Sequence, residues 1–222
     1  MKKIFNKENL LKFFRTYIWL MVLLFVIDIV TKWVVLNHFG IEAMIGGTRS
    51  ESGAIPVIKN FCYIGGSIND GAAFSLFSGQ RIPLLLISLI MTGAFIAYYV
   101  IQYKKLTTVY KVALALMIAG GFGNLIDRAF YWPSITGFGG VIDWIIFRFG
   151  PTEHEEFAMF NIADSCLVIG IIVVLIAIII DEVKEVKEKA KRGEYKYSPE
   201  QLEKMNKEKE AQEKQNEGNK GE

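Results

Sequence analysis

Four aspartates lie within or beside long apolar stretches of this 222-residue chain: Asp28, Asp127, Asp143 and Asp164. An ionisable side chain at membrane depth is costly and therefore indicates a functional site. Two carboxylates that share a site do not ionise together easily, so one of them keeps its proton. The ionised carboxylate can then take a proton from water while the protonated one donates to a carbonyl oxygen. Such a pair suits hydrolysis of a peptide bond without a metal ion or a covalent intermediate.

The other reactive side chains do not indicate a competing site. The two histidines, His38 and His154, occur in no HExxH motif, so we predict no metal site and no cofactor. Ser67 lies in no GxSxG motif and has no histidine nearby in the sequence, which disfavours a serine nucleophile. We interpret Cys62 and Cys166 as small buried residues without a disulfide.

Four apolar segments must position the aspartates. A helix needs about 20 mostly apolar residues to cross the hydrocarbon core of a bilayer. The segments that approach this length are 17–36, 82–101, 112–126 and 162–180. The third is short unless Asp127 and Arg128 lie at the membrane boundary. We therefore predict an all-α polytopic membrane protein with four transmembrane helices.

The distribution of basic residues predicts the orientation of these helices. With both termini in the cytoplasm, the inner segments carry 19 of the 25 Lys and Arg residues, as the positive-inside rule requires. Spans three and four then place Asp127 and Asp164 toward the outer leaflet, and Asp143 lies between them in the sequence. Asp28 lies about 17 Å along span one, at 1.5 Å per residue. All four carboxylates are therefore expected near the outer leaflet.

Local spacing adds polar partners to the aspartates. Asp28 and Lys32 are four residues apart, which predicts an ion pair on one helix face. Asn124 and Asn161 each precede an aspartate by three residues, so the amide and the carboxylate share a face if both segments are helical. The glycines within 120–123 would let a neighbouring helix or a peptide backbone approach closely.

Two segments lie outside the predicted spans on the outer side, 37–81 and 131–161. The first contains β-rich pieces at 54–58 and 61–64 that glycines separate, which predicts a small extracytoplasmic sheet resting on the membrane. The second contains an apolar stretch at 141–149 that we interpret as an interfacial segment.

The C-terminal part differs in composition from the rest. Residues 181–222 contain 11 basic and 12 acidic side chains, which leaves 14 and 11 for residues 1–180. So few charges cannot cover a water-soluble domain of that size, which excludes a soluble globule. We predict a four-helix transmembrane domain at 1–180 and a charged cytoplasmic tail at 181–222, helical near 199–214 and then disordered. A net charge of +2 without a basic stripe does not indicate nucleic-acid binding.

Two other classes of function are open at this point. A small transporter would use the acids as a proton relay and would distribute them along a path across the membrane, but the inner halves of spans two to four carry none. A membrane anchor whose tail does the work would tolerate Asp→Asn changes in the spans. The residues alone also leave open whether Asp127 or Asp143 pairs with Asp164.

Five short motifs occur in order along residues 17–180. They are DIVTKW at 28–33, NDGAAF at 69–74, GGFGNLIDR at 120–128, VID at 141–143 and FNIAD at 160–164. On four predicted spans with this topology, the set resembles the lipoprotein signal peptidase (signal peptidase II) family, the aspartyl proteases of bacterial membranes. The resemblance covers residues 17–180 and does not extend to the C-terminal tail.

The resemblance implies removal of signal peptides from diacylglyceryl-modified prolipoproteins by cleavage just before the lipidated cysteine. It implies Asp143 and Asp164 as the catalytic dyad. Asp127 then becomes a support residue paired with Arg128. The other matched positions, which shape the site or hold substrate, are Asp28, Lys32, Asn69, Gly71, Asn124, Asn161 and Ala163. Lipid-modified prolipoproteins and membrane lipids are the implied partners, and a monomer in the bacterial inner membrane is the implied form.

Overall fold

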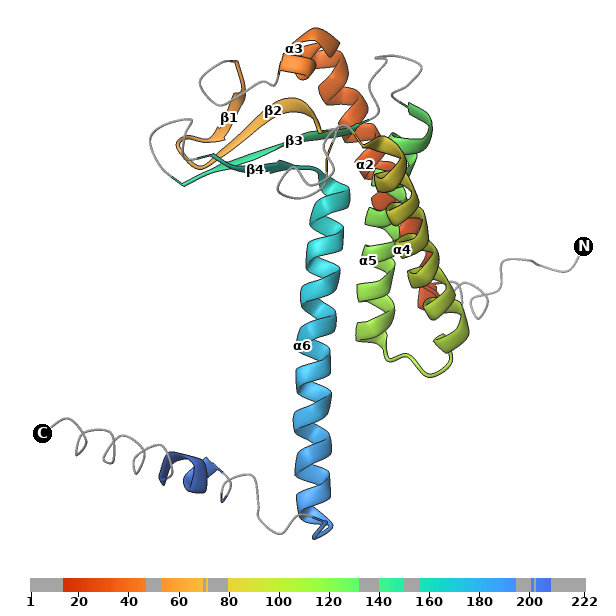
Figure 1. Ribbon diagram of the computed structural model, residues 1–222, viewed down its shortest axis with the longest axis vertical. Coiled ribbons are helices and arrows are strands. Elements are labelled where there is room, and N and C mark those ends of the chain that lie inside the picture. The colour runs from red at the N-terminus through yellow and green to blue at the C-terminus, as the bar shows by residue number, and fades with distance from the viewer. Residues whose placement is uncertain are drawn as a thin grey trace, which may run out of the picture. The chain divides into compact units, whose positions relative to one another are not determined.

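A computed structural model describes residues 14–46, 53–69, 71, 80–131, 140–149, 156–194, 201 and 203–208. Its long helices are α2 (Ile18–Phe39), α4 (Arg81–Gln102), α5 (Thr108–Ile126) and α6 (Ile162–Lys191) (Figure 1). All four are long and apolar enough to cross a membrane, which confirms the four predicted spans. The third span is 22 residues long, Thr108–Ala129, because its helix begins before the predicted start and a π-helical turn, η2 (Asp127–Tyr131), continues it.

Helix α5 packs against both α2 and α4 and is the most buried of the four spans (Figure 1). In its apolar window 61% of the residues are buried, against 17% in α2 and in α4. The exposed apolar side chains of α2 and α4 are typical of surfaces that face lipid, where exposure carries no hydrophobic penalty. The sequence of α5 is therefore the one that neighbouring helices restrict most.

Glycines on different sides of α5 allow this close packing. A Cβ at Gly121 would lie 2.5 Å from Thr92 Oγ1 of α4, closer than real Cβ atoms come. A Cβ at Gly123 would lie 2.5 Å from Asp28 Oδ2 of α2 and 2.9 Å from Ala163 Cβ of α6. The close approach of neighbouring helices predicted at these glycines is confirmed.

An antiparallel sheet lies at the end of the helices where α6 begins (Figure 1). Its strands, in sheet order, are β1 (Ile55–Ile58), β2 (Cys62–Asn69), β3 (Val141–Arg148) and β4 (Glu156–Phe160). The strands predicted at 54–58 and 61–64 are confirmed. The stretch at 141–149, predicted as a separate interfacial segment, is β3 of the same sheet and pairs with β2. A short apolar run can form either an interfacial segment or a strand, and here its pairing with β2 makes it a strand.

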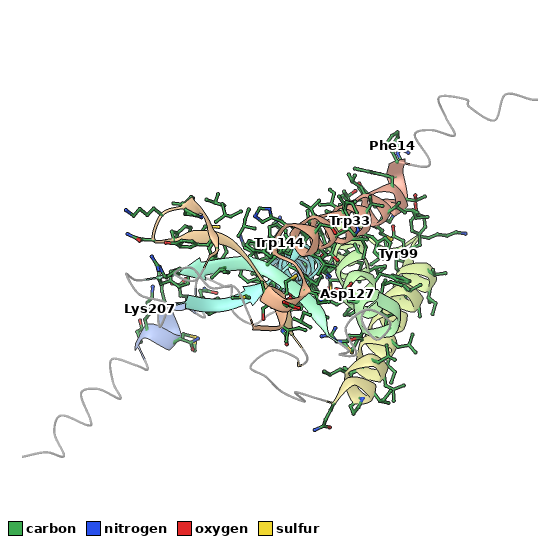
Figure 2. All side chains as sticks on the ribbon, turned by 90° about the horizontal axis from the view of Figure 1, so that it is seen from above. Phe14, Trp33, Tyr99, Asp127, Trp144 and Lys207 are labelled. Atoms are coloured by element: carbon green, nitrogen blue, oxygen red, sulfur yellow. The ribbon has the colours of Figure 1, made fainter. Side chains whose placement is uncertain are left out.

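A short helix, α3 (Ile41–Gly46), connects α2 to the sheet. Gly40 separates the two helices with a φ of 77°, in the left-handed region that glycine adopts without strain. Met44 of α3 is fully buried and clusters with Val35 of α2 and Ile142 of β3. Trp144 of β3 packs against the same cluster, where the helices meet the sheet (Figure 2). This contact fixes the end of α2 against β3.

Helix α6 is 30 residues long and continues past residue 180, where the sequence predicted the end of the fourth span. It is about 45 Å long, more than a hydrocarbon core of about 30 Å requires. The chain divides into two compact units, Met1–Val174 and Leu175–Glu222. Residues 203–208 of the second unit are helical, within the predicted tail helix. The division into a membrane domain at 1–180 and a tail at 181–222 stays a prediction.

Some predictions concern residues outside the described ranges. They include positions 72–74 of the NDGAAF motif, His154 and the tail beyond residue 208. The residues that the resemblance assigns to the site, from Asp28 to Asp164, are all described.

Candidate active site

A buried ammonium group joins two of the four aspartates. Lys32 Nζ lies 2.7 Å from Asp28 Oδ2 and 2.8 Å from Asp127 Oδ2. It also donates a hydrogen bond of 3.3 Å to Asn124 Oδ1, so its three N–H donors have three acceptors. The three charged side chains are at most 3% exposed. The predicted Asp28–Lys32 pair is confirmed, and Asp127 also forms an ion pair with Lys32.

The second oxygen of Asp28 binds the start of α6. Asp28 Oδ1 accepts a hydrogen bond of 2.8 Å from the backbone N–H of Ala163. The first N–H groups of a helix have no partner within the helix, so this bond satisfies one of them and joins α2 to α6. Ala163 is 1% exposed, and its Cβ lies close to Gly123. Small side chains at both positions are therefore needed for Asp28 to reach α6.

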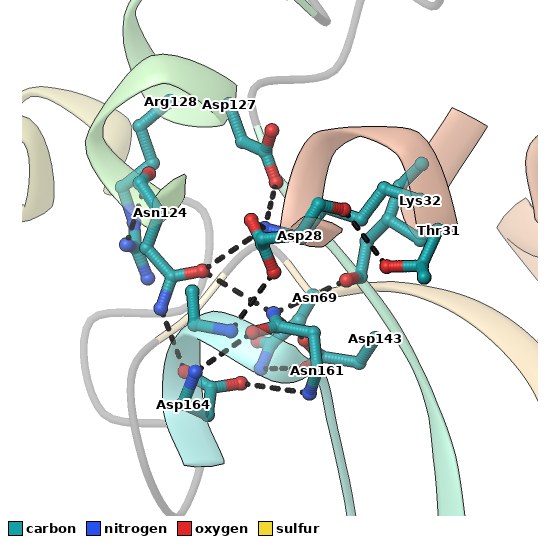
Figure 3. A network of polar contacts seen from close by, with 12 residues as sticks. Asp28, Thr31, Lys32, Asn69, Asn124, Asp127, Arg128, Asp143, Asn161 and Asp164 are labelled. Carbon is teal, nitrogen blue, oxygen red and sulfur yellow. Dashed lines mark hydrogen bonds and ion pairs between the residues drawn. The ribbon is translucent and has the colours of Figure 1, made fainter. Parts of the chain in front are cut away.

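The other two aspartates come from different elements. Asp143 lies on β3, and Asp164 lies in the first turn of α6. Asn161 contacts both of them: its Nδ2 donates to Asp143 Oδ1 at 2.8 Å, and its backbone N–H donates to Asp164 Oδ2 at 3.2 Å (Figure 3). Asn69 Nδ2 donates to Asp143 Oδ2 at 2.9 Å, and Asn124 Nδ2 donates to Asp164 Oδ1 at 2.6 Å. Each of the four carboxylate oxygens therefore accepts a hydrogen bond from an N–H group.

Local sequence explains much of this geometry. Asn161 precedes α6, and its Oδ1 accepts a hydrogen bond of 2.8 Å from the backbone N–H of Asp164. Because the Asp164 carboxylate accepts the N–H of Asn161 in return, the two residues form a capping box at the helix start. On the sheet, the register of β2 and β3 places Ser67 opposite Asp143 and Asn69 two residues away on the same face.

Arg128 connects the site to α4 and to the chain after β2. Its guanidinium donates to the carbonyl oxygen of Gly71 at 3.3 Å and to Ser88 Oγ at 3.5 Å. Gly71 in turn donates its N–H to Asn69 Oδ1 at 3.0 Å. Ser88 was not predicted as a site residue, because the apolar span of α4 carries no charge that would indicate a site. The hydroxyl group within this span was the feature that could have indicated it. All the predicted site residues belong to one polar network.

Burial and a neighbouring carboxylate change the acidity of Asp143. Its side chain is 2% exposed, and loss of hydration together with the charge of Asp164 raises its pKa from 3.8 to about 8. The amide donors of Asn69 and Asn161 and the ammonium group of Lys32 oppose this rise without cancelling it. At neutral pH Asp143 is therefore mostly protonated, which is the state that a general acid needs.

The two pairs of aspartates differ in what they can do chemically. Asp28 and Asp127 share the single ammonium group of Lys32, and their contacts hold α2, α5 and α6 together. Asp143 and Asp164 accept neutral amide donors, and one of them carries a proton at neutral pH. Within the described part of the chain, no group of three or more His, Cys, Asp or Glu side chains is arranged to hold a metal ion. Acid–base activation of water is the chemistry that this arrangement supports.

Known proteins share this architecture. The model of the family Signal peptidase (SPase) II matches residues 20–180. The lipoprotein signal peptidase of Bacillus pumilus is 34% identical over 148 residues, which are 67% of this chain and 82% of that protein. The lipoprotein signal peptidase of Geobacillus kaustophilus is 32% identical over 158 residues, which are 71% of this chain and 89% of that protein.

Solved structures agree with this relationship. One bacterial membrane enzyme superposes with a TM-score of 0.59 at 30% identity, over 75% of this chain and 89% of its own. A second superposes with a TM-score of 0.55 at 29% identity, over 73% of this chain and 92% of its own. Because the family model covers most of the chain and the four spans lie within this fold, the chain belongs to the signal peptidase II family and is a multi-pass protease of the bacterial membrane.

Proposed function

We propose that this protein removes the signal peptide from diacylglyceryl-modified prolipoproteins by cleaving the peptide bond just before the lipidated cysteine. The relatives in Bacillus pumilus and Geobacillus kaustophilus are named lipoprotein signal peptidases, which supports this class of substrate. A lipid-anchored substrate also suits an enzyme whose carboxylates lie among membrane helices, because the substrate reaches the site without leaving the bilayer.

The catalytic residues in this proposal are Asp143 and Asp164. The observation that carries the proposal is the difference between the two pairs of aspartates. Lys32 pairs with Asp127 at 2.8 Å, and this ion pair already engages the Asp127 carboxylate in joining α5 to α2. Asp143 instead accepts two neutral amides and holds a proton at neutral pH. This favours Asp143 over Asp127 as the partner of Asp164.

Hydrolysis at this pair proceeds without a covalent intermediate. A water molecule loses a proton to the ionised carboxylate as its oxygen attacks the scissile carbonyl carbon. The protonated carboxyl group gives its proton to the carbonyl oxygen, which leaves a neutral gem-diol. Collapse of the diol breaks the C–N bond, protonates the leaving amine and returns both carboxyl groups to their starting states.

The remaining network residues position this pair. They are Asp28, Lys32, Asn69, Gly71, Asn124, Asp127, Arg128, Asn161 and Ala163. The orientation proposed is both termini in the cytoplasm and the pair near the outer leaflet, which the distribution of basic residues supports. The protein acts as a monomer in the inner membrane and uses no cofactor.

A cleavage assay tests this proposal directly. Purified protein in detergent, incubated with a lipid-modified precursor, should release the signal peptide and leave the lipidated cysteine as the new N-terminus, detected by mass spectrometry. Asp143→Asn and Asp164→Asn should each slow cleavage by roughly 10²–10⁴-fold, the usual contribution of an acid–base group. Glu42→Gln, which removes an exposed acid on α3, is the matched control and should cleave normally. Cleavage at another bond, or full activity in both aspartate variants, would refute the proposal.

A further inference from the structure

Asn161 binds the two proposed catalytic carboxylates with different groups. Its main-chain N–H and its side-chain Oδ1 both bond to Asp164, through the capping box. Its side-chain Nδ2 donates to Asp143 Oδ1 at 2.8 Å and also to Asn124 Oδ1 at 3.2 Å. Asn161 itself is fully buried, so water does not compete for these bonds. One residue therefore sets the surroundings of both carboxylates.

Asp164 accepts its hydrogen bonds at the start of a helix. As the third residue of α6 it lies at the helix N-terminus, where unpaired N–H groups carry a partial positive charge. One carboxylate oxygen accepts a helix-start N–H at 3.2 Å, and the other accepts the Asn124 amide at 2.6 Å. The Arg128 guanidinium interacts electrostatically with Asp164 more strongly than with Asp143.

The surroundings of Asp143 favour its uncharged form. It lies on a strand, away from any helix terminus, and is 2% exposed. Charged groups face it from three elements: Lys32 of α2, Arg128 of η2 and Asp164 of α6. Burial raises the pKa of Asp143 most and the negative charge of Asp164 raises it further, while Lys32 and the amides of Asn69 and Asn161 oppose the rise.

We infer that Asn161 is a positioning residue that holds two aspartates with different tasks: Asp164 takes the proton from water, and Asp143 donates its proton to the scissile carbonyl oxygen. The inference rests on the proposed function and adds the direction of proton transfer to it. Asn161 acts through both carboxylates, because it presents a helix-start N–H to the base and a neutral amide to the acid.

The variant Asn161→Ser separates the two contacts. Serine keeps an oxygen that can accept the N–H of Asp164 at the helix start, but it has no amide donor for Asp143. We expect kcat to fall roughly ten- to a hundredfold with KM unchanged, which is the value of one oriented hydrogen bond to a charged or reacting group. The basic limb of the pH profile should move to higher pH, because the lost amide bond lowers the pKa of Asp143 in the wild type. The acidic limb should stay.

Ser165→Ala is the matched control within the same helical turn. Its hydroxyl donates to the carbonyl oxygen of Asn161 and, within the part of the chain that the structure describes, to neither carboxylate. We expect wild-type kcat, KM and pH profile from this control. If Asn161→Ser lost activity while both limbs of its pH profile stayed at their wild-type positions, Asn161 would be a structural cap and the inference would be wrong.

A titration that does not depend on cleavage tests the same inference. In an Asp164→Asn background, carboxyl-carbon NMR should show Asp143 titrating well above its ordinary pKa of 3.8, because burial contributes most of the rise. Adding Asn161→Ser should raise the pKa of Asp143 further. An ordinary pKa for Asp143, or no change on adding Asn161→Ser, would overturn the inference. Failure of the wild type to cleave the precursor would instead refute the proposed function and leave this titration as the deciding measurement.

Discussion

Replacing Asp143 by asparagine should change how the stability of the protein depends on pH. The carboxyl group has an ordinary pKa of 3.8, and burial together with the charge of Asp164 raises its pKa to about 8 in the folded protein. Because the fold holds this proton more tightly than the unfolded chain does, the group stabilises the fold at low pH. That contribution is fully present below about pH 4 and is lost as the pH rises to about 8.

The size of the effect follows from the two pKa values. Within this window the wild-type free energy of unfolding should fall by about 1.4 kcal/mol per pH unit because of this one group. Between about pH 5 and about pH 7.5 the fall amounts to about 3 kcal/mol. The variant has no carboxyl group to titrate, so it should lack this slope. Its absolute stability is a poorer measure, because the new NH₂ group faces the amide donor of Asn69 or Asn161, at a cost of about 1–3 kcal/mol.

Denaturant unfolding in detergent at the two pH values measures this slope. The proteins to compare are the wild type, Asp143→Asn and Glu42→Gln. Glu42 is exposed on α3, so its variant loses a carboxyl group without altering the buried network and should keep the wild-type slope. Equal slopes in the wild type and Asp143→Asn would show that folding does not protonate Asp143 and that Asp143 is not a neutral acid in the site.

Four further predictions follow from the same contacts. Asp127→Asn should lower thermal stability yet leave measurable cleavage, and a well-folded but inactive variant would place this aspartate in the catalytic group. A chain that ends at Lys191 should cleave at the full rate, since every network residue precedes it; loss of activity with normal insertion would give the tail a role. Reporter fusions after Gly53 should indicate the outer side and fusions after Lys105 the inner side, and the reverse result would contradict the orientation. Gly123→Ala should lower the melting temperature and the activity together, because its Cβ would lie 2.5 Å from a carboxylate oxygen; a wild-type melting curve would show that the helices separate freely.

The sequence by itself determined the membrane architecture and the local polar contacts. An apolar run of about 20 residues has a helix as its stable form in a bilayer, because only a helix satisfies every backbone group within one segment. The four spans therefore follow from composition alone. Asp28 and Lys32 meet because four residues make about one helical turn. The contact between Asn161 and Asp164 is equally local, since both lie at the start of one helix.

Strand formation at 141–149 was decided by the tertiary structure. A short apolar run fits a strand as well as an interfacial segment, and its own periodicity does not distinguish them. Pairing with β2, whose partner residues lie 72 to 85 positions earlier in the chain, selects the strand. The same pairing brings Asn69 to Asp143, a contact that no local spacing encodes.

The tertiary structure also decided which aspartates belong together. Asp127 and Asp143 look alike in the sequence, as each is an acid beside an apolar segment. Packing of α5 on α2 brings Asp127 to the ammonium group of Lys32, which forms an ion pair with it. Strand pairing and Asn161 bring Asp143 into the network of Asp164. The two acids therefore differ through contacts between residues far apart in the chain, and only the folded backbone supplies those contacts.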